Sequence, residues 1–367
     1  MIKGNVKYDE LLSYAKQVLE KLGYPKAQAE ITAWVLVEAD ARGVPSHGVG
    51  RLPFYESNIK SAFVFPKAEP EVVFETPLSA VIDGHNGIGA HISKFAMDRV
   101  LEKAKNVGAG FAAVRNSSHF GMAALWAEMA PAKGYIGMSF TNTRICSVVT
   151  FGRERILGTN PVCFAIPTSG KTPFVLDMAT TTTAHGKVEV YERRKKQMPL
   201  GWCVDEEGND TADTLAFQNI YRTSKFGGHL FLGGASEELG GHKGYGLGLL
   251  VDLLCAGMSM GTWSRDTFTK AKGCQVAHFF GAIRTDLFGD AAQIANHVES
   301  ILQEVRNSTK AKGHDRIYIH GEKELEAKAV SMVDGVQVDE VEWDMLDSYA
   351  EKFGLEKVKA MKVAATA

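Results

Sequence analysis

The alternation of strand-like and helix-like segments from residue 72 onward is the strongest constraint on how this 367-residue chain folds. The strand-like segments are short and apolar, and they lie at 72–74, 80–83, 110–115, 136–141, 162–166 and 174–177. The helical patterns between and after them lie at 89–107, 121–133, 184–194 and 242–258. This alternation predicts an α/β fold, in which helices cover a sheet.

The two ends of the chain follow other patterns. Apolar residues recur at helical spacing over 11–22 and again over 27–42, and a glycine follows each pattern. After residue 291 we expect more helix, one short strand at 317–319 and a charged helical tail. The segment 202–241 is rich in Gly, Asp, Glu and Thr, so loops are expected there. We predict two regions: a helical N-terminal lobe at 1–75, completed by 310–367, and an α/β region at 76–309.

Charge and cysteine content exclude several classes of protein. The 41 basic and 43 acidic residues create no global field that would favour nucleic acid or an anionic membrane. Five widely spaced cysteines without a CxxC pair indicate neither a disulfide framework nor a zinc site, and they suit a reducing cytoplasm. Charged residues within the first fourteen positions predict no targeting peptide. The apolar window 244–261 contains Asp252 and several glycines, which favours a buried helix over a membrane span.

The segment SHGVGR at 46–51 places a histidine four residues before an arginine in a glycine-rich turn. With an ordinary pKa of about 6.5, His47 could take and return a hydroxyl proton. The guanidinium of Arg51 could bind a carboxylate through two hydrogen bonds. Ser46 could cap a further helix that puts both side chains on one face and has a kink at Pro53. The alternative is a solvated surface pair.

Two glycine-containing segments follow predicted strands. The segment DGHNGIG at 83–89 lacks a complete GxGxxG pattern because Ile92 stands where the third small residue belongs, so a Rossmann site is not expected. The segment RNSSHFG at 115–121 leaves a strand and is predicted to enter a helix, whose N–H groups favour an anion and a neutral His119. His119 could bind a carbonyl or hydroxyl group, or it could merely satisfy the backbone at a helix cap.

Three polar segments could bind a cofactor. The strand ends at 158–161 and 176–183 carry hydroxyls and N–H donors, and Asp177 could accept a hydrogen bond from a ribose hydroxyl. Alternatively, these β-branched residues have only a structural role and end in a helix cap. The segment GGHKG at 240–244 opens an apolar helix, and Lys243 there suits a phosphate or ribose contact. It does not match GxxxxGK[ST], so a nucleoside triphosphatase is not expected.

Taken together, these segments resemble the type-2 malate/L-lactate dehydrogenase family, which includes ureidoglycolate, sulfolactate and diketogulonate dehydrogenases or reductases. The resemblance covers most of residues 8–325 in order. The matching stretches are SHGVGR (46–51), DGHNGIG (83–89), RNSSHFG (115–121), LGTNPVCFAIP (157–167), DMATT (177–181) and GGHKGYGL (240–247).

The resemblance implies a non-Rossmann nicotinamide-binding fold, with a mixed sheet, flanking helices and an N-terminal helical segment. It implies a homodimer in which 76–309 binds the cofactor and dimerises. The expected activity is hydride transfer between NAD, or alternatively NADP, and a small 2-hydroxy or 2-oxo acid, with malate and oxaloacetate as the expected pair. Lactate, sulfolactate and ureidoglycolate are alternative substrates. A non-catalytic dinucleotide-binding protein is the alternative from another class.

The resemblance also assigns roles to residues, and none of them is a metal ligand. His47 is expected to transfer the proton with Ser46 beside it, and His119 is the second choice. Arg51, Ser46 and Thr143 are expected to bind substrate. The cofactor is expected to contact His119, Phe120, Gly121, Met122, Ala123, Leu176, Asp177, Met178, Ala179, Thr180, Thr181, Thr182, His242, Lys243, Gly321 and Glu322.

Overall fold

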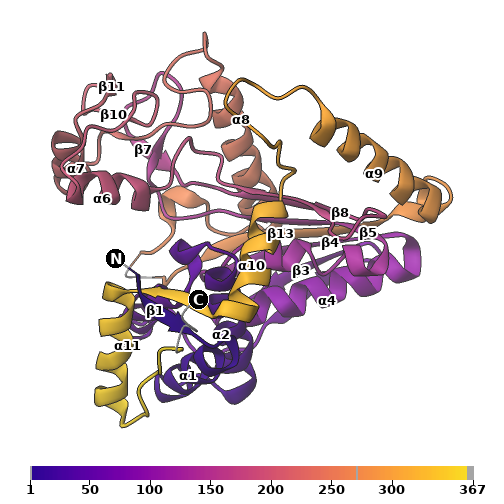
Figure 1. Cartoon of the computed structure of the whole chain (residues 1–367), viewed down its shortest axis with the longest axis horizontal. Helices are drawn as coiled ribbons and strands as arrows, with labels where there is room; N and C mark the ends of the chain where they lie inside the picture. Colours follow the sequence, from indigo (N-terminus) through magenta and orange to yellow (C-terminus); the bar gives the residue numbers. More distant parts are fainter. Residues whose placement is uncertain (1, 270–271, 362–367) are drawn as a thin grey trace, which may run out of the picture.

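A seven-stranded mixed sheet forms the centre of the computed structural model, which describes residues 2–269 and 272–361 (Figure 1). In spatial order its strands are β2 (Glu71–Glu75), β3 (Ser79–Asp83), β4 (Ala109–Ser117), β13 (Val276–Arg284), β5 (Tyr135–Thr141), β8 (Val162–Ile166) and β9 (Phe174–Met178). Only β3 and β4 pair in parallel, and every other neighbouring pair in this sheet is antiparallel. The predicted α/β class is therefore confirmed, and the strand order is not that of a doubly wound sheet.

Helices cover both faces of this sheet. The helices α4 (Gly89–Val107) and α5 (Ala124–Ala127) pack on one face, where Phe280 is fully buried in the main core. On the other face, α8 (Gly241–Asp252) continues into a π-helical turn at Leu253–Gly257 and packs on Ala277 and Phe279. Successive residues of β13 thus contribute to opposite faces, as the pleat of a strand requires.

The two ends of the chain build one lobe together. Its N-terminal elements are β1 (Ile2–Val6), α1 (Tyr8–Lys21), α2 (Lys26–Ala41) and α3 (Leu52–Lys60). Its C-terminal elements are α10 (Glu322–Asp334), β14 (Val336–Asp339) and α11 (Glu340–Phe353). The strands β1 and β14 pair antiparallel, and the Tyr14 hydroxyl donates to the carbonyl oxygen of Leu346 (Figure 1). The division into regions 1–75 with 310–367 and 76–309 stays a prediction.

The segment predicted as loops at 202–241 instead belongs to a small lobe with its own sheet. Its strands are β6 (Ser147–Val148), β7 (Arg155–Leu157), β10 (Cys203–Val204), β11 (Asp210–Thr211) and β12 (Gly228–His229), and its helices are α6 (His185–Arg193) and α7 (Thr214–Thr223). A separate core around Val188, Met198, Cys203 and Phe217 holds the lobe together. Strands of two or three residues are too short to show a periodic pattern.

Three other sequence predictions need correction. Only the short α5 and a 3-10 turn at Pro131–Lys133 replace the helix predicted at 121–133, because Gly121 has φ +84° and Pro131 interrupts the pattern. The segment 317–319 is not a strand. Directly after it, the carbonyl oxygen of His320 accepts a backbone hydrogen bond from Val175 of β9. The apolar helix α8 is buried on one side only, and Leu247 and Leu250 are exposed.

The helix α9 (Ala291–Asn307) follows β13, and Ser169 donates a backbone hydrogen bond to the carbonyl oxygen of Ala295 within it. None of the helices in the described part of the chain has the length and apolar character needed to cross a membrane.

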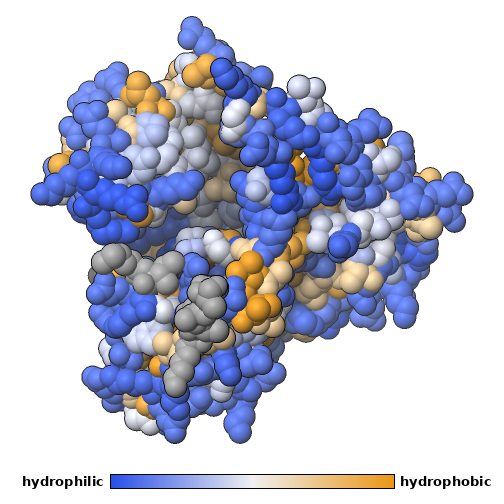
Figure 2. All heavy atoms as spheres, in the orientation of Figure 1, coloured by the Kyte–Doolittle hydropathy of each residue, from blue (hydrophilic) through white to orange (hydrophobic). Residues whose placement is uncertain are grey.

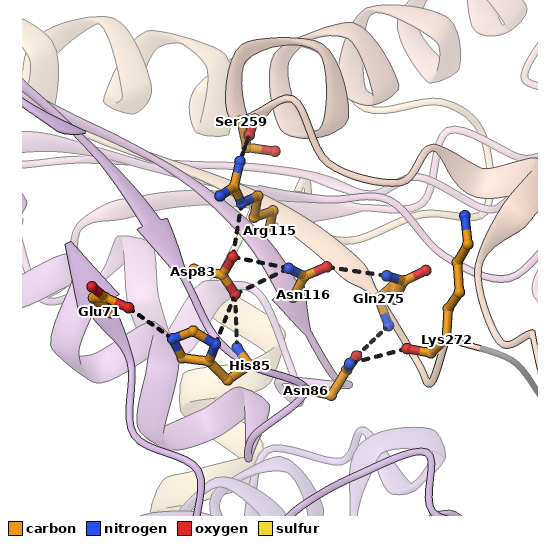
Figure 3. A network of polar contacts seen from close by, with 9 residues as sticks. All are labelled: Glu71, Asp83, His85, Asn86, Arg115, Asn116, Ser259, Lys272 and Gln275. Atoms are coloured by element: carbon orange, nitrogen blue, oxygen red, sulfur yellow. Dashed lines mark hydrogen bonds and ion pairs between the residues drawn. The ribbon is translucent and has the colours of Figure 1, made fainter. Parts of the chain in front are cut away.

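The segment DGHNGIG links β3 and β4 to the chain that enters β13 (Figure 3). The Asp83 carboxylate accepts hydrogen bonds from Arg115 Nε at 2.9 Å and from Asn116 Nδ2 and the backbone N–H of His85 at 3.0 Å. Asn86 Oδ1 accepts from the backbone N–H of Gln275. His85, Asn86, Asn116 and Gln275 all have φ between 49° and 55°, which is uncommon for residues other than glycine. This network offsets their backbone strain and fixes the two segments relative to each other.

The same segment supports the backbone around His119. Ser118 Oγ accepts from the backbone N–H of Gly89 and donates to the carbonyl oxygen of Gly87, both at 2.9 Å. A Cβ at position 89 would lie 2.3 Å from the carbonyl oxygen of Ser118 and 2.4 Å from that of His119. The glycine at the start of α4 is therefore required by close backbone packing, and DGHNGIG acts as a support for the His119 segment.

We predict that Gly89→Ala lowers the free energy of unfolding by about 1–3 kcal/mol, because the added methyl group must displace two carbonyls. Urea unfolding followed by circular dichroism measures the change. Gly186→Ala is the matched control, since a Cβ there meets no atom within 4 Å and the position lies in the first turn of α6. That control should unfold at the same or a higher urea concentration. Equal stability of Gly89→Ala and the unmodified protein would contradict the assignment.

Candidate active site

A cavity of about 800 Å³ lies where the N-terminal lobe, the central sheet and the small lobe meet. Figure 2 shows the surface hollowed between the lobe of α6 and α7 and the N-terminal helices. Segments distant in sequence thus meet around one space. The predicted site residues that line the cavity are His47, His119, Phe120, Gly121, Met122, Ala123, Thr143, Asp177, Met178, Ala179 and Gly321.

The other predicted site residues lie beside the cavity or away from it. Ser46 and Arg51 adjoin His47 in its turn, and Glu322 is ion-paired with Arg306 and Arg316. In α8, His242 and Lys243 are exposed in the first turn, so the predicted start of that helix is confirmed while their predicted contacts stay untested. The residues Leu176, Thr180, Thr181 and Thr182 do not line the cavity, and each of the three threonine hydroxyls donates to a backbone carbonyl.

The turn that carries His47 consists of two 3-10 turns, Pro45–His47 and Val49–Arg51, followed directly by α3. The prediction of a helix capped by Ser46 and kinked at Pro53 is wrong. Pro53 instead lies in the first turn of α3, where its missing N–H costs no helical hydrogen bond. The Ser46 hydroxyl lies 2.9 Å from His47 Nδ1, and Arg51 Nε donates to the carbonyl oxygen of Ser46.

The rings of His47 and His119 stack, with centroids 5.5 Å apart and an interplanar angle of 23°. Burial, with a smaller contribution from the Arg51 charge, lowers the pKa of His47 to about 4. Burial also lowers the pKa of His119 well below its usual range, with smaller contributions from His47, Arg51 and His278. Both imidazoles are therefore neutral at neutral pH in the free protein.

The hydrogen bonds of His119 fix its tautomer. Its Nδ1 lies 3.3 Å from the backbone N–H of Gly121 and 2.9 Å from the Tyr55 hydroxyl. A backbone N–H can only donate, so Nδ1 accepts and the neutral ring carries its proton on Nε2. The expectation that His119 begins a helix is wrong, because α5 begins at Ala124. Burial and nearby charge keep His119 neutral, rather than a helix dipole.

Ser46 leaves the tautomer of His47 open. A serine hydroxyl can rotate and can either donate to Nδ1 or accept from it. In the second case, His47 Nε2 carries a lone pair and can accept a proton. The two stacked rings thus differ in what they can do: His119 is set up as a hydrogen-bond donor, and His47 can act as donor or base.

Asp177 lines the cavity near β9. Its Oδ2 accepts from the backbone N–H of Ala124 at 2.8 Å. Burial, with smaller contributions from the carboxylates of Glu128 and Glu324, raises the pKa of Asp177 to about 6, against the lowering effects of the Ala124 N–H and Arg42. A carboxyl with such a pKa changes its charge close to neutral pH.

Thr143 is held by the segment GTNP. The backbone N–H of Thr143 donates to Asn160 Oδ1 at 3.2 Å, and Thr143 Oγ1 accepts from the backbone N–H of Thr159 at 2.9 Å. A Cβ at Gly158 would lie 2.0 Å from Thr143 Oγ1, which explains the glycine there. This segment therefore supports a residue of the cavity wall.

Sequence reasoning missed several residues of the site. Tyr55 follows Arg51 by four residues, so helical spacing could have placed it on the same face. Arg144 lies beside Thr143, is exposed, lines the cavity and has no ion-pair partner in the described part of the chain. Phe54 and Phe268 line the cavity with ring centroids 6.3 Å apart, and nothing local in the sequence indicates that contact.

Similarity to known proteins extends over almost the whole chain. The family model described as malate/L-lactate dehydrogenase matches residues 6–347. The malate dehydrogenase of Pyrococcus abyssi is 40% identical over 356 residues, 97% of this chain and 96% of that protein. The L-sulfolactate dehydrogenase of Methanocaldococcus jannaschii is 37% identical over 340 residues, 92% of this chain and 94% of that protein.

The similarity to known proteins also extends to the fold of a solved structure. The malate dehydrogenase of Pyrococcus horikoshii matches with a TM-score of 0.87 at 39% identity, and the match covers 96% of this chain and 97% of that one. The mixed sheet with flanking helices is thus the fold of these enzymes. The chain belongs to the malate/L-lactate dehydrogenase family, as its sequence motifs indicated.

Proposed function

We propose that the chain is a nicotinamide-dependent dehydrogenase that interconverts malate and oxaloacetate. The observation that carries this proposal is the stacked, neutral pair of His47 and His119 in the cavity wall, with the Arg51 guanidinium beside it. Such a site combines a proton acceptor, a hydrogen-bond donor and a carboxylate-binding cation, which are the groups that oxidation of a 2-hydroxy acid requires.

The cavity residues suit a nicotinamide cofactor. Its volume of about 800 Å³ lies within the range of roughly 300–1,000 Å³ that is usual for cofactor and ligand sites. Residues 119–123 and 177–179 with Gly321 would hold the cofactor, and the second Asp177 oxygen could accept from a ribose hydroxyl. When bound, the cofactor accepts or supplies the hydride at C2 of the substrate. We propose NAD as this cofactor, with NADP as the alternative.

In the proposed oxidation, His47 takes the proton of the substrate hydroxyl through Nε2. His119 donates a hydrogen bond from Nε2 to the same oxygen and holds it in place, and Arg51 binds the C1 carboxylate. In the reverse direction, a protonated His47 returns the proton to the oxygen of the 2-oxo acid. Burial of both rings strengthens these interactions because little water competes with them.

A second anionic group on the substrate is favoured by Arg144 and Lys187. Both are exposed, line the cavity and lack an ion-pair partner within residues 2–269 and 272–361. Their charges favour malate over lactate, since only malate has a carboxylate beyond C2. Sulfolactate is the second candidate on the same ground, because its sulfonate is also an anion. Ureidoglycolate has no second anionic group and is less favoured.

We also propose a cytoplasmic homodimer. Leu247, Leu250 and Leu253 are exposed along α8 and its π-helical extension, and an apolar row of this kind suits burial against a second copy. All five cysteines are buried and free, which suits a reducing compartment.

A spectrophotometric screen tests the substrate and the cofactor together. NADH and NADPH oxidation is followed with oxaloacetate, sulfopyruvate, pyruvate and glyoxylate-derived substrates. We expect the highest kcat/KM with oxaloacetate and NADH. Measurable NADH binding without turnover of any substrate would support the non-catalytic alternative, and pyruvate as the best substrate would contradict the role of Arg144 and Lys187.

His47→Ala should lower kcat by about a hundredfold to ten-thousandfold, because general acid–base catalysis contributes that much. The Kd for NADH, measured by fluorescence titration, should stay nearly unchanged. His297→Ala is the matched control, since this histidine is exposed on α9 and does not line the cavity. Unchanged turnover of His47→Ala would remove His47 from the proposed chemistry.

The binding of NADH should weaken as the pH falls through about 6. The pKa of Asp177 is raised to about 6, so the carboxylate that accepts the ribose hydrogen bond is present above this pH and lost below it. Between pH 7.5 and pH 5, we expect the Kd for NADH to rise about tenfold. Asp177→Asn should show weaker binding with no such pH dependence. A Kd of the unmodified protein that is constant over this range would contradict the role of Asp177.

A further inference from the structure

Asp40, in the last turn of α2, lies against the turn that carries His47. Its side chain is buried, with the residue only 8% exposed. Oδ2 accepts a hydrogen bond from the backbone N–H of Val49 at 2.7 Å. Oδ1 is also buried and has no hydrogen-bond partner within the described residues. Burying a carboxyl oxygen without a hydrogen-bond partner lowers the stability of the folded protein, so we expect Asp40 to serve another purpose.

The position of Gly48 shows where this carboxyl group acts. Gly48 has φ −85° and ψ −163°, a conformation that any residue adopts, so the backbone alone does not require glycine. A Cβ at this position would lie 1.6 Å from Asp40 Oδ1 and 2.1 Å from Asp40 Cγ. The side chain of Asp40 thus occupies the space that a side chain at position 48 would need.

Backbone hydrogen bonds connect this contact to both functional side chains. Gly48 lies between His47 and Val49, and its carbonyl oxygen accepts from the backbone N–H of Arg51 at 2.9 Å. Arg51 Nε donates to the carbonyl oxygen of Ser46 on the other side. Any movement of the peptide at Gly48 therefore changes the separation of the imidazole and the guanidinium.

The end of α2 is itself anchored to another residue of the cavity wall. Arg42, two residues after Asp40, is buried and forms an ion pair with Glu128 at 2.7 Å. Glu128 lines the cavity. The end of α2 is thus held in place by Glu128, so Asp40 has a fixed position against the turn that carries His47.

We propose that Asp40 is a positioning residue, which fixes His47 and Arg51 relative to each other by filling the space at Gly48 and by binding the N–H of Val49. The proposal rests on the function proposed above for these two residues. Burial, with the charges of Glu342 and Asp339, raises the pKa of Asp40 well above its usual range and so favours the uncharged form. Asparagine has nearly the same shape and keeps an acceptor for Val49, so it should replace aspartate well.

The first test compares two substitutions at position 40. For Asp40→Ala, we expect kcat for 2-oxo acid reduction to fall about tenfold to a hundredfold, because small displacements of reacting groups have effects of this size. The Kd for NADH should change less than twofold. For Asp40→Asn, we expect at least half of the original kcat. An Asp40→Asn variant as impaired as Asp40→Ala, or an Asp40→Ala variant with full kcat, would overturn the proposal.

The second test is a double-mutant cycle that does not depend on turnover. Gly48→Ala alone should lower the Tm by about 4 °C or more, since the new methyl group overlaps the carboxyl of Asp40. In the Asp40→Ala background, the same change should lower the Tm by less than half as much, because the space is then free. Additive Tm shifts would show that the two side chains do not compete for this space and would overturn the proposal.

Asp347→Ala is the matched control, because it removes another partly buried carboxylate of the same lobe that does not contact the turn. It should lower the Tm without lowering kcat. Absence of turnover in the unmodified protein would count against the proposed function. Turnover that is insensitive to Asp40→Ala would count against the positioning role alone. If Asp40→Ala does not fold, the other two variants still test the proposal. Asp40→Asn must keep kcat, and Gly48→Ala must lower it.

Discussion

The hydrogen bonds of His278 hold together the three strands on which the cavity depends. Its Nε2 lies 2.8 Å from Ser117 Oγ on β4, and its Nδ1 lies 2.8 Å from Thr141 Oγ1 on β5. Thr141 Oγ1 also lies 2.8 Å from the carbonyl oxygen of Asn142 and 3.2 Å from that of Ala277, and both of these can only accept its proton. Nδ1 of His278 can therefore donate to Thr141, and Nε2 can accept from Ser117. Burial lowers the pKa of His278 to about 3, and the ring stays neutral.

The buried ring of His278 also positions two segments that form part of the cavity wall. Phe120 stacks on His278 with centroids 4.5 Å apart and an interplanar angle of 7°. The residue before Phe120 is His119, and the residues after Thr141 lead to Thr143. The insertion of β13 between β4 and β5 therefore brings the two polar strand ends together, and Gly89 and Ser118 support the same segment from the side of α4.

Local periodicity predicted the elements that depend on short-range packing. The helix at 89–107 and the strand at 162–166 have the predicted bounds, because their apolar spacing is local, as are Gly108 after the helix and the prolines at 161 and 167 beside the strand. The place of β13 in the sheet could not be predicted, since its partners lie more than 130 residues earlier in the chain. The sequence motifs identified His47 and His119, but their stacking depends on the contacts of Phe54 and Tyr55 in α3 with His119 after β4. The two-residue strands of the small lobe gave no periodic signal.

The proposed division between the two histidines follows from which nitrogen of each ring is free. The lone pair of neutral His119 lies on Nδ1, which already accepts from Gly121 and Tyr55, so its Nε2 cannot take a proton from substrate. Protonation at Nδ1 would bring that proton against the N–H of Gly121. His47 has no such restriction, because its Nδ1 contacts only a hydroxyl that can reverse its role. The same two residue types therefore perform different tasks, and the backbone amide of Gly121 makes the difference.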